Sequence, residues 1–373
     1  MTVLAVPVDF ILFAMTLLGV AVFHHHTLKV ALTGLVVITL YKLTLGNFGG
    51  TPGMEGLIQM LAHEWVLVLN LLGLLLGFAL LSDHFERSGL PAILPNYLPD
   101  DWKGGFVLLI LVFVISSFLD NIAAAMIGGT MASVLYRKKV HIGFLAAIVG
   151  ASNAGGSGSV VGDTTTTMMW IAGVKPGQVF ESYAGAVVAL VIFGVIAARQ
   201  QHAFQPIMKD AVQGARVHWA RLCIVAIILV SAVAANIYFN LVQPEILDRF
   251  PVIGAAVWLA ILVTAPWRKP TWSVLPDAAK GSVFLLSLVM CAAMMPVQAL
   301  PAASWQSAFG LGFVSAVFDN IPLTALALHQ GGYDWGFLAY AVGFGGSMIW
   351  FGSSAGVALS SMYPEAKSVG AWI

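Results

Sequence analysis

Two glycine-rich stretches decide the fold of this chain. They read Gly155-Gly156-Ser157-Gly158-Ser159-Val160-Val161-Gly162-Asp163-Thr164 and Gly345-Gly346-Ser347-Met348-Ile349-Trp350-Phe351-Gly352-Ser353-Ser354. In both, four residues separate a Gly-Gly-Ser triplet from a glycine followed by two polar residues, and the offset between the stretches is 190 at each end (345 − 155 and 352 − 162). The stretches interrupt long apolar runs, 141–173 and 335–362. Matching glycine breaks in two apolar runs predict an internal repeat.

The composition favours a membrane protein and excludes most other classes. Of 373 residues, 59% are hydrophobic and 9% charged, whereas soluble domains carry about 25% charged residues. Seventeen basic and seventeen acidic side chains give a formal charge of zero, which excludes a strongly basic surface for nucleic acid. Cys223 and Cys291 lie in apolar runs and indicate neither a disulfide framework nor a zinc site. The predicted fold class is an all-α polytopic membrane protein in contact with lipid.

Several apolar runs are candidates for crossing a bilayer, which takes about 20 residues in a helix. Uninterrupted runs cover 6–23, 28–46, 64–82, 178–199, 217–238, 252–266 (short) and 281–300. Two others, 104–136 and 305–330, contain Asp120-Asn121 and Asp319-Asn320. We interpret these two as re-entrant hairpins, which enter and leave the membrane on the same side.

The distribution of lysine and arginine supports this interpretation. If 104–136 is a hairpin, Lys103 and Arg137-Lys138-Lys139 both face the cytoplasm, where basic residues accumulate. If 305–330 is a second hairpin, the loops 47–63 and 331–334, which hold no lysine or arginine, face outside. The two hairpins then have opposite orientations. The N-terminus lies outside, and we expect the bacterial inner (cytoplasmic) membrane as the location.

The chain divides into two inverted repeats, 1–199 and 217–373, joined by a cytoplasmic linker, 200–216. The first repeat has five crossings and the second has four, so we expect a final helix to be missing after Ile373. Inverted repeats with broken helices are typical of secondary transporters. Glycine breaks leave backbone groups without helical partners, and such groups persist in a membrane only where protein, water or an ion satisfies them.

Three carboxylates lie deep in apolar sequence: Asp120, Asp163 and Asp319. A charge at the bilayer centre costs at least ~2.5–3.5 kcal/mol, so we predict that they are functional. The alternative is that each caps the N-terminus of a half-helix, and the two roles are compatible. Because removal from water favours the neutral form of a carboxyl group, such a group can exchange a proton for a cation.

Neutral oxygen donors surround these carboxylates in the sequence. They are Asn121, Asn153, Ser157, Thr164, Thr165, Asn320, Ser347, Ser353 and Ser354. Hard cations prefer oxygen ligands, and the C-terminal ends of half-helices favour cations. We therefore predict a Na+ or Li+ site that uses Asp163 first, with Asp120 and Asp319 next, and we expect no resident cofactor.

Four motifs together resemble the NhaD-type sodium/proton antiporters of the ion transporter superfamily, which includes arsenite permeases and citrate carriers. They are Phe118-Leu119-Asp120-Asn121, Ser152 through Trp170, Phe318 through Ala325 and Gly345 through Gly356. The resemblance covers about 114–173 and 311–369. It implies opposed hairpins in inverted repeats, a scaffold domain that forms a homodimer, and an elevator-like motion. It also implies that Asp120-Asn121, Asn153, Asp163-Thr164, Asp319-Asn320, Ser347 and Ser353-Ser354 line the transport site.

The second break differs from the first in one important position. Ser353 stands where the first break has Asp163, so the two half-sites are not equivalent. If two cation sites exist, they should differ in their coupling to protons.

The leading hypothesis is therefore a Na+(Li+)/H+ antiporter. The alternative is a sodium- or proton-coupled carrier of a small anion, such as a carboxylate or an arsenite-like oxyanion. Against it, the motifs contain no arginine or lysine, and the hairpin tips read Asp-Asn, where dicarboxylate symporters of the superfamily have Ser-Asn-Thr. An intramembrane aspartyl protease would need glycine at position 160, which is Val160. We expect that the protein is not an enzyme.

Overall fold

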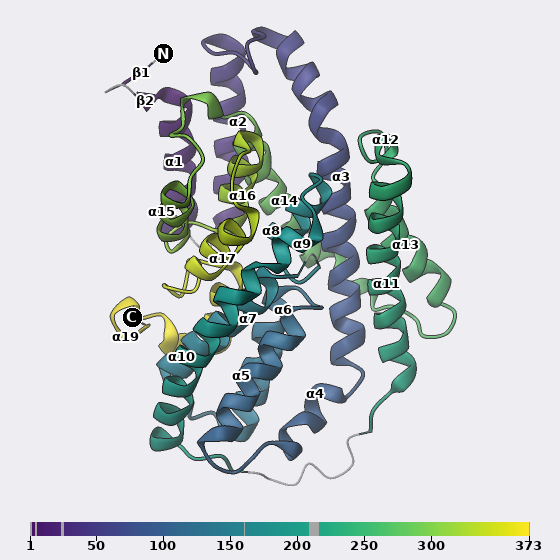
Figure 1. The fold of residues 1–373 in the computed structure, drawn as a ribbon, viewed down its shortest axis with the longest axis vertical. Helices are drawn as coiled ribbons and strands as arrows, with labels where there is room; N and C mark the ends of the chain where they lie inside the picture. The colour runs from purple at the N-terminus through teal and green to yellow at the C-terminus, as the bar shows by residue number, and fades with distance from the viewer. Residues whose placement is uncertain (1, 4–5, 24–25, 160, 209–215, 373) are drawn as a thin grey trace.

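The computed structural model describes the whole chain except residues 1, 4–5, 24–25, 160, 209–215 and 373. The described part is almost entirely helical (Figure 1), with one short antiparallel pair formed by β1 (Thr2–Val3) and β2 (Val6–Pro7). Five helices are long and apolar enough to cross a membrane, namely Thr27–Thr44, Gly53–Glu86, Pro176–Phe204, Trp219–Asn240 and Trp272–Ala293. The predicted fold class, an all-α polytopic membrane protein, is confirmed.

The first half of the chain contains α1 (Val8–Val22), α2 (Thr27–Thr44), α3 (Gly53–Glu86), α4 (Leu90–Ile93), η2 (Leu94–Tyr97), α5 (Trp102–Ser116), α6 (Asn121–Leu135), α7 (Ile142–Ser157), α8 (Thr164–Ile171), α9 (Pro176–Phe180) and α10 (Ser182–Phe204). The second half contains α11 (Trp219–Val242), α12 (Pro244–Leu247), α13 (Val252–Thr264), η3 (Trp272–Val274), α14 (Leu275–Ala293), η4 (Val297–Ala299), α15 (Trp305–Ser315), α16 (Asn320–Gln330), α17 (Trp335–Gly345), α18 (Ser354–Met362), η5 (Pro364–Ala366) and α19 (Val369–Trp372).

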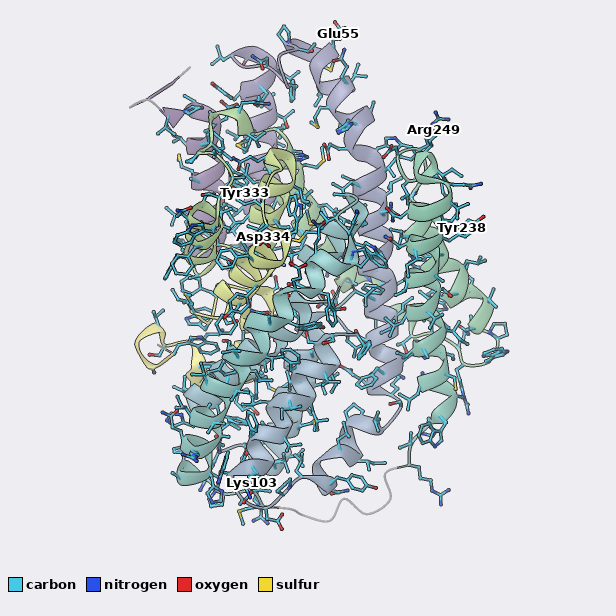
Figure 2. The ribbon with its side chains drawn as sticks, in the orientation of Figure 1. Glu55, Lys103, Tyr238, Arg249, Tyr333 and Asp334 are labelled. Carbon is cyan, nitrogen blue, oxygen red and sulfur yellow. The ribbon has the colours of Figure 1, made fainter. Side chains whose placement is uncertain are left out.

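Two of the predicted spans have different limits in the structure. The run 64–82 belongs to a longer helix, α3, which begins at Gly53 because its polar first turns extend beyond the apolar segment. Figure 2 shows Glu55, in the first turn of α3, at the end of the molecule opposite Lys103. The run 281–300 is displaced: α14 ends at Ala293, before Pro296, since proline disfavours helical geometry at the residue that precedes it.

The linker and the chain end also bear on the predicted repeats. Helix α10 continues to Phe204, so the predicted linker 200–216 begins inside a helix, and its residues 209–215 lie outside the described part. The final helix expected after Ile373 also lies outside it. The division into two inverted repeats stays a prediction.

Each of the four interrupted runs folds as two helices with a short connection. The run 104–136 gives α5 and α6, and 305–330 gives α15 and α16; the run 141–173 gives α7 and α8, and 335–362 gives α17 and α18. In Figure 1, α5 and α6 lie in the lower half of the molecule and α15 and α16 in the upper half. Helix α5 packs on α7, α15 on α17, α6 on α18, and α16 on α8. The assignment of the two pairs as re-entrant hairpins stays a prediction.

Glycine is required where the backbones of these helices cross. A Cβ atom added at Gly155 in α7 would overlap the carbonyl oxygen of Phe113 in α5, and one added at Gly345 in α17 would overlap the carbonyl oxygen of Gly312 in α15. Each glycine break therefore lies in close contact with the helix that precedes an Asp-Asn pair.

We call the eight helices α5–α8 and α15–α18 the hub.

A second group of helices, α2, α3, α11, α13 and α14, stands beside the hub. Helix α3 packs on α11, α13 and α14. The crossing of α3 and α13 is close: the Asn70 side-chain oxygen accepts the Gly254 N–H at 3.0 Å, and the indole of Trp258 donates to the Gly73 carbonyl at 3.0 Å. Together, α3 and α14 form a wall that faces the hub.

We predict that Gly155→Ala and Gly345→Ala each destabilise the protein. The added methyl group must displace a backbone carbonyl, and overpacking of this kind typically costs about 1–3 kcal/mol. Thermal unfolding of the purified protein in detergent should show a lower midpoint for both variants. Gly310→Ala in α15 is the matched control, because nothing lies within 4 Å of the added carbon. Equal midpoints for all three variants would show that the crossings are looser than described.

Candidate functional site

Four helices begin and four helices end around one point in the hub. Helices α6, α8, α16 and α18 begin there, and their N-caps are Asp120, Asp163, Asp319 and Ser353. Each cap accepts a backbone N–H of its own helix, at 2.9, 3.3, 3.0 and 3.2 Å respectively. The first N–H groups of a helix have no helical partner, and a membrane offers no water to replace one. The capping role considered for the three aspartates is therefore real.

Hydroxyl groups at the ends of α5 and α15 donate to backbone carbonyls of the helices that they pack on, α7 and α17. Ser116, at the end of α5, donates to the Ser152 carbonyl of α7 at 2.6 Å, and Ser315, at the end of α15, donates to the Val342 carbonyl of α17 at 2.8 Å. The Gly155 carbonyl accepts the hydroxyl of Tyr183 at 3.1 Å. The two breaks are thus stabilised in similar ways.

Asp163 lies deepest among the carboxylates and joins the two halves of the chain. Its side chain is 2% exposed. Its Oδ2 atom accepts the Thr165 hydroxyl at 2.8 Å and the Asn320 side-chain amide at 3.3 Å. Among the residues that the structure describes, Asp163 has no ion pair with a lysine, arginine or histidine. Because no basic side chain compensates its negative charge, a buried carboxylate of this kind favours binding of a proton or a cation.

Asn153 is the second link between the halves. Its side-chain oxygen accepts the Asn121 amide at 3.0 Å, and its own amide donates to the hydroxyls of Ser347 at 3.0 Å and Ser353 at 3.1 Å. These four side chains come from α6, α7 and the second break. The structure brings these four predicted site residues together, and their role in transport stays a prediction.

The remaining predicted residues lie close to these two groups. Asp319 accepts the Ser354 hydroxyl at 2.8 Å, and Asp120 and Thr164 line one cavity. The Ser157 hydroxyl donates to the Ala154 carbonyl of its own helix at 2.9 Å. The Ser157 hydroxyl therefore does not bond to Asp163 or Asn153. The Cβ atom of Ser157 nevertheless faces Gly343 of α17.

A cavity of about 570 Å³ lies between the hub and the wall. Six of the predicted site residues line it: Asp120, Asn121, Asp163, Thr164, Asn320 and Ser354. Its other side is formed by α3 and α14, which contribute Ser82, Asp83 and Asp277 among others. No motif links α3 and α14 to the site, because they reach it only through tertiary packing. Asp83 is paired with Arg87 and Asp277 with Lys280, both at 2.8 Å.

Comparisons with known proteins agree with the resemblance that the motifs indicated. The chain is 26% identical over 337 residues to sodium/proton antiporter 1 of Arabidopsis thaliana, covering 77% of this chain and 53% of that protein. It is 27% identical over 345 residues to sodium/proton antiporter 2 of the same plant (77% and 73%) and 27% identical over 315 residues to the Na+/H+ antiporter NhaD of Vibrio parahaemolyticus (69% and 72%). The chain resembles the NhaD-type sodium/proton antiporters. No protein-family model matches it.

The chain spans about half the length of the first of these relatives and somewhat more of the other two. The relatives' names describe transport across membranes, in agreement with the apolar helices of this chain. The protein is thus an integral membrane protein that resembles transporters.

We predict that water reaches the cavity between hub and wall. Ser82→Cys, introduced after replacement of Cys223 and Cys291, should react with a charged, membrane-impermeant thiol reagent, because Ser82 lines the cavity. Leu262→Cys is the control: Leu262 is 57% exposed on α13, on a face that we expect to contact lipid. Mass spectrometry of the protein in sealed vesicles measures the modification. Equal modification of both cysteines would contradict a separate aqueous cavity.

Proposed function

We propose that this protein is a secondary active transporter that exchanges Na+ (or Li+) for H+ across a membrane. One observation carries the proposal: Asp163 is a buried carboxylate at a helix break, has no basic partner in the described chain, and lines a cavity. The similarity to proteins named sodium/proton antiporters supports it.

The exchange follows from what the Asp163 side chain can bind. Protonated, the group is neutral and keeps its bonds to Thr165 and Asn320. Ionised, it needs a compensating positive charge, because charges in a low-dielectric interior are costly when unpaired. Sodium supplies that charge and accepts oxygen ligands from the hydroxyls and freed carbonyls nearby. Since a proton and a cation compete for the same carboxylate, release of one accompanies binding of the other.

Asp120 and Asp319 have a supporting role in this proposal. Each accepts a backbone N–H of the helix that it caps, and Asp319 also accepts the Ser354 hydroxyl. Both side chains are less buried than Asp163, so an uncompensated charge costs less at their positions. They add negative potential at the site and can complete the cation's coordination as it enters from the cavity.

We further propose an elevator-like motion of the hub against the wall, with the protein acting as a homodimer in a bacterial inner membrane and its N-terminus outside. The cavity lies between the hub and the wall. Movement of the hub along the wall would therefore carry the site and change the side of the membrane to which it is open. At the far end of this border, His329 of α16 lies 3.8 Å from Glu64 of α3. Figure 2 shows Lys103 at the lower end of the molecule and Arg249 in its upper part. Under the hairpin interpretation, Lys103 shares its side of the membrane with Arg137-Lys138-Lys139, which supports a cytoplasmic location for the Lys103 end.

We predict that purified protein in liposomes loaded with a pH-sensitive dye gives a pH change on addition of sodium or lithium chloride. Asp163→Asn should reduce this change to the level of protein-free liposomes, because an amide cannot exchange a proton for a cation. Asp120→Asn and Asp319→Asn should weaken it. Asp248→Asn is the control, since Asp248 is exposed in the connection between α12 and α13, outside the hub.

In the same assay, potassium, citrate and arsenite are each added to the liposomes, and the pH change is measured. If sodium alone causes no pH change, but sodium together with an organic anion or arsenite does, coupled anion transport would replace antiport as the proposed function. A normal sodium response in all three aspartate variants, each shown to be folded, would contradict the assignment of the site.

A further inference from the structure

The site consists of two half-sites that correspond residue by residue. We define half-site A as Asn121, Asn153, Ser347 and Ser353, and half-site B as Asn320, Gly343, Ser157 and Asp163. The break residues correspond at the offset of 190, which pairs Asn153 with Gly343, Ser157 with Ser347 and Asp163 with Ser353. Asn121 and Asn320 occupy equal positions at the starts of α6 and α16.

Half-site A is filled by one of its own side chains. The amide group of Asn153 lies between the hydroxyls of Ser347 and Ser353 and donates to both, at 3.0 and 3.1 Å. An amide nitrogen has two N–H donors, so both are used. Asn153 is fully buried, and its nitrogen occupies the position from which a cation would contact those two hydroxyl oxygens.

Half-site B has no such side chain, because the residue that corresponds to Asn153 is Gly343. A Cβ atom placed on Gly343 would lie 3.2 Å from the Ser157 Cβ and 3.8 Å from the Asp163 Oδ2. Position 343 thus points between Ser157 and Asp163, as position 153 points between Ser347 and Ser353. Without a side chain there, the Asn320 amide reaches Asp163 directly, at 3.3 Å.

The two half-sites also differ in charge, in a way that fits the amide in half-site A and its absence from half-site B. Half-site A has only neutral groups, and the partial positive charge of an amide N–H₂ suffices to satisfy its two hydroxyls. Half-site B contains a buried carboxylate, which a neutral amide cannot neutralise. A full positive charge is needed there, in the form of a proton or a cation.

We propose that the protein has one exchangeable cation site per chain, half-site B, which Gly343 keeps open, and that the Asn153 amide permanently takes the place of the cation in half-site A. This inference rests on the proposed function, because it assigns the cation of the antiport reaction to a single half-site. It makes Gly343 and Asn153 the residues that determine how many ions the protein binds.

The first test fills half-site B with an amide. Purified wild-type protein should bind one radioactive sodium ion per chain in a scintillation proximity assay, and Gly343→Asn should bind none. Gly310→Asn is the matched control: it makes the same change in a helix of the hub, at a glycine with nothing within 4 Å, and should bind one sodium ion. Gel filtration and thermal unfolding show whether each variant is folded.

The reciprocal test opens half-site A and does not depend on the folding of Gly343→Asn. The double variant Asn153→Ala/Ser353→Asp removes the amide and supplies a carboxylate that can still cap α18; it should bind two sodium ions per chain. Ser353→Asp alone keeps the amide in the cation's place, so its new carboxyl group should stay protonated and the variant should gain no second ion.

The outcomes separate this inference from the proposed function. Two sodium ions bound by the wild type, or one sodium ion still bound by folded Gly343→Asn, would overturn the single-site assignment while leaving antiport intact. No gain of a second ion in the folded double variant would also count against it. A wild type that binds no sodium and moves no protons would overturn the proposed function and this inference together.

Discussion

The structure depends on one constraint: helix ends in the middle of a membrane must find partners for their backbone groups. Lipid offers no hydrogen-bond partner, and each N–H or carbonyl left unpaired costs several kcal/mol. Four helix starts in the hub are capped by Asp120, Asp163, Asp319 and Ser353, and hydroxyls bond freed carbonyls. The polar residues at the centre are therefore needed for folding before they are considered for transport.

The same constraint supports the proposal that the site binds ions. A capping side chain places an oxygen atom at the N-terminal, positive end of a helix. A helix that ends at a break leaves carbonyl oxygens without helical partners at its C-terminal end. Where several caps and breaks meet, oxygen atoms from different elements surround one small volume. The Asn320 amide on Asp163 and the Ser354 hydroxyl on Asp319 tie these elements together. A site made from helix ends is consequently rigid in its parts, and it can move only as the hub moves.

The sequence predicted the parts of this arrangement that depend on local chemistry. Glycine breaks, Asp-Asn pairs and hydroxyl runs have few uses in apolar sequence, so the fold class could be anticipated. The pairing of Asn153 with Asn121, Ser347 and Ser353 is known only from the structure. The limits of α3 and α14 could not, since hydropathy registers apolar length and overlooks polar first turns. The cavity wall was also beyond prediction, because Ser82 and Asp277 reach the site only through packing of distant helices.

The two halves satisfy the same constraint with different residues, and that difference has a physical meaning. Repeated breaks create two places where oxygens converge, and each must be filled by something positive or by a hydrogen-bond donor. A side-chain amide does this permanently and without charge, as Asn153 does between Ser347 and Ser353. A carboxylate beside a glycine does it only when an ion or a proton is present. In the single-site proposal, half-site A provides structural stability and half-site B exchanges ions, so coupling needs only one of the two half-sites.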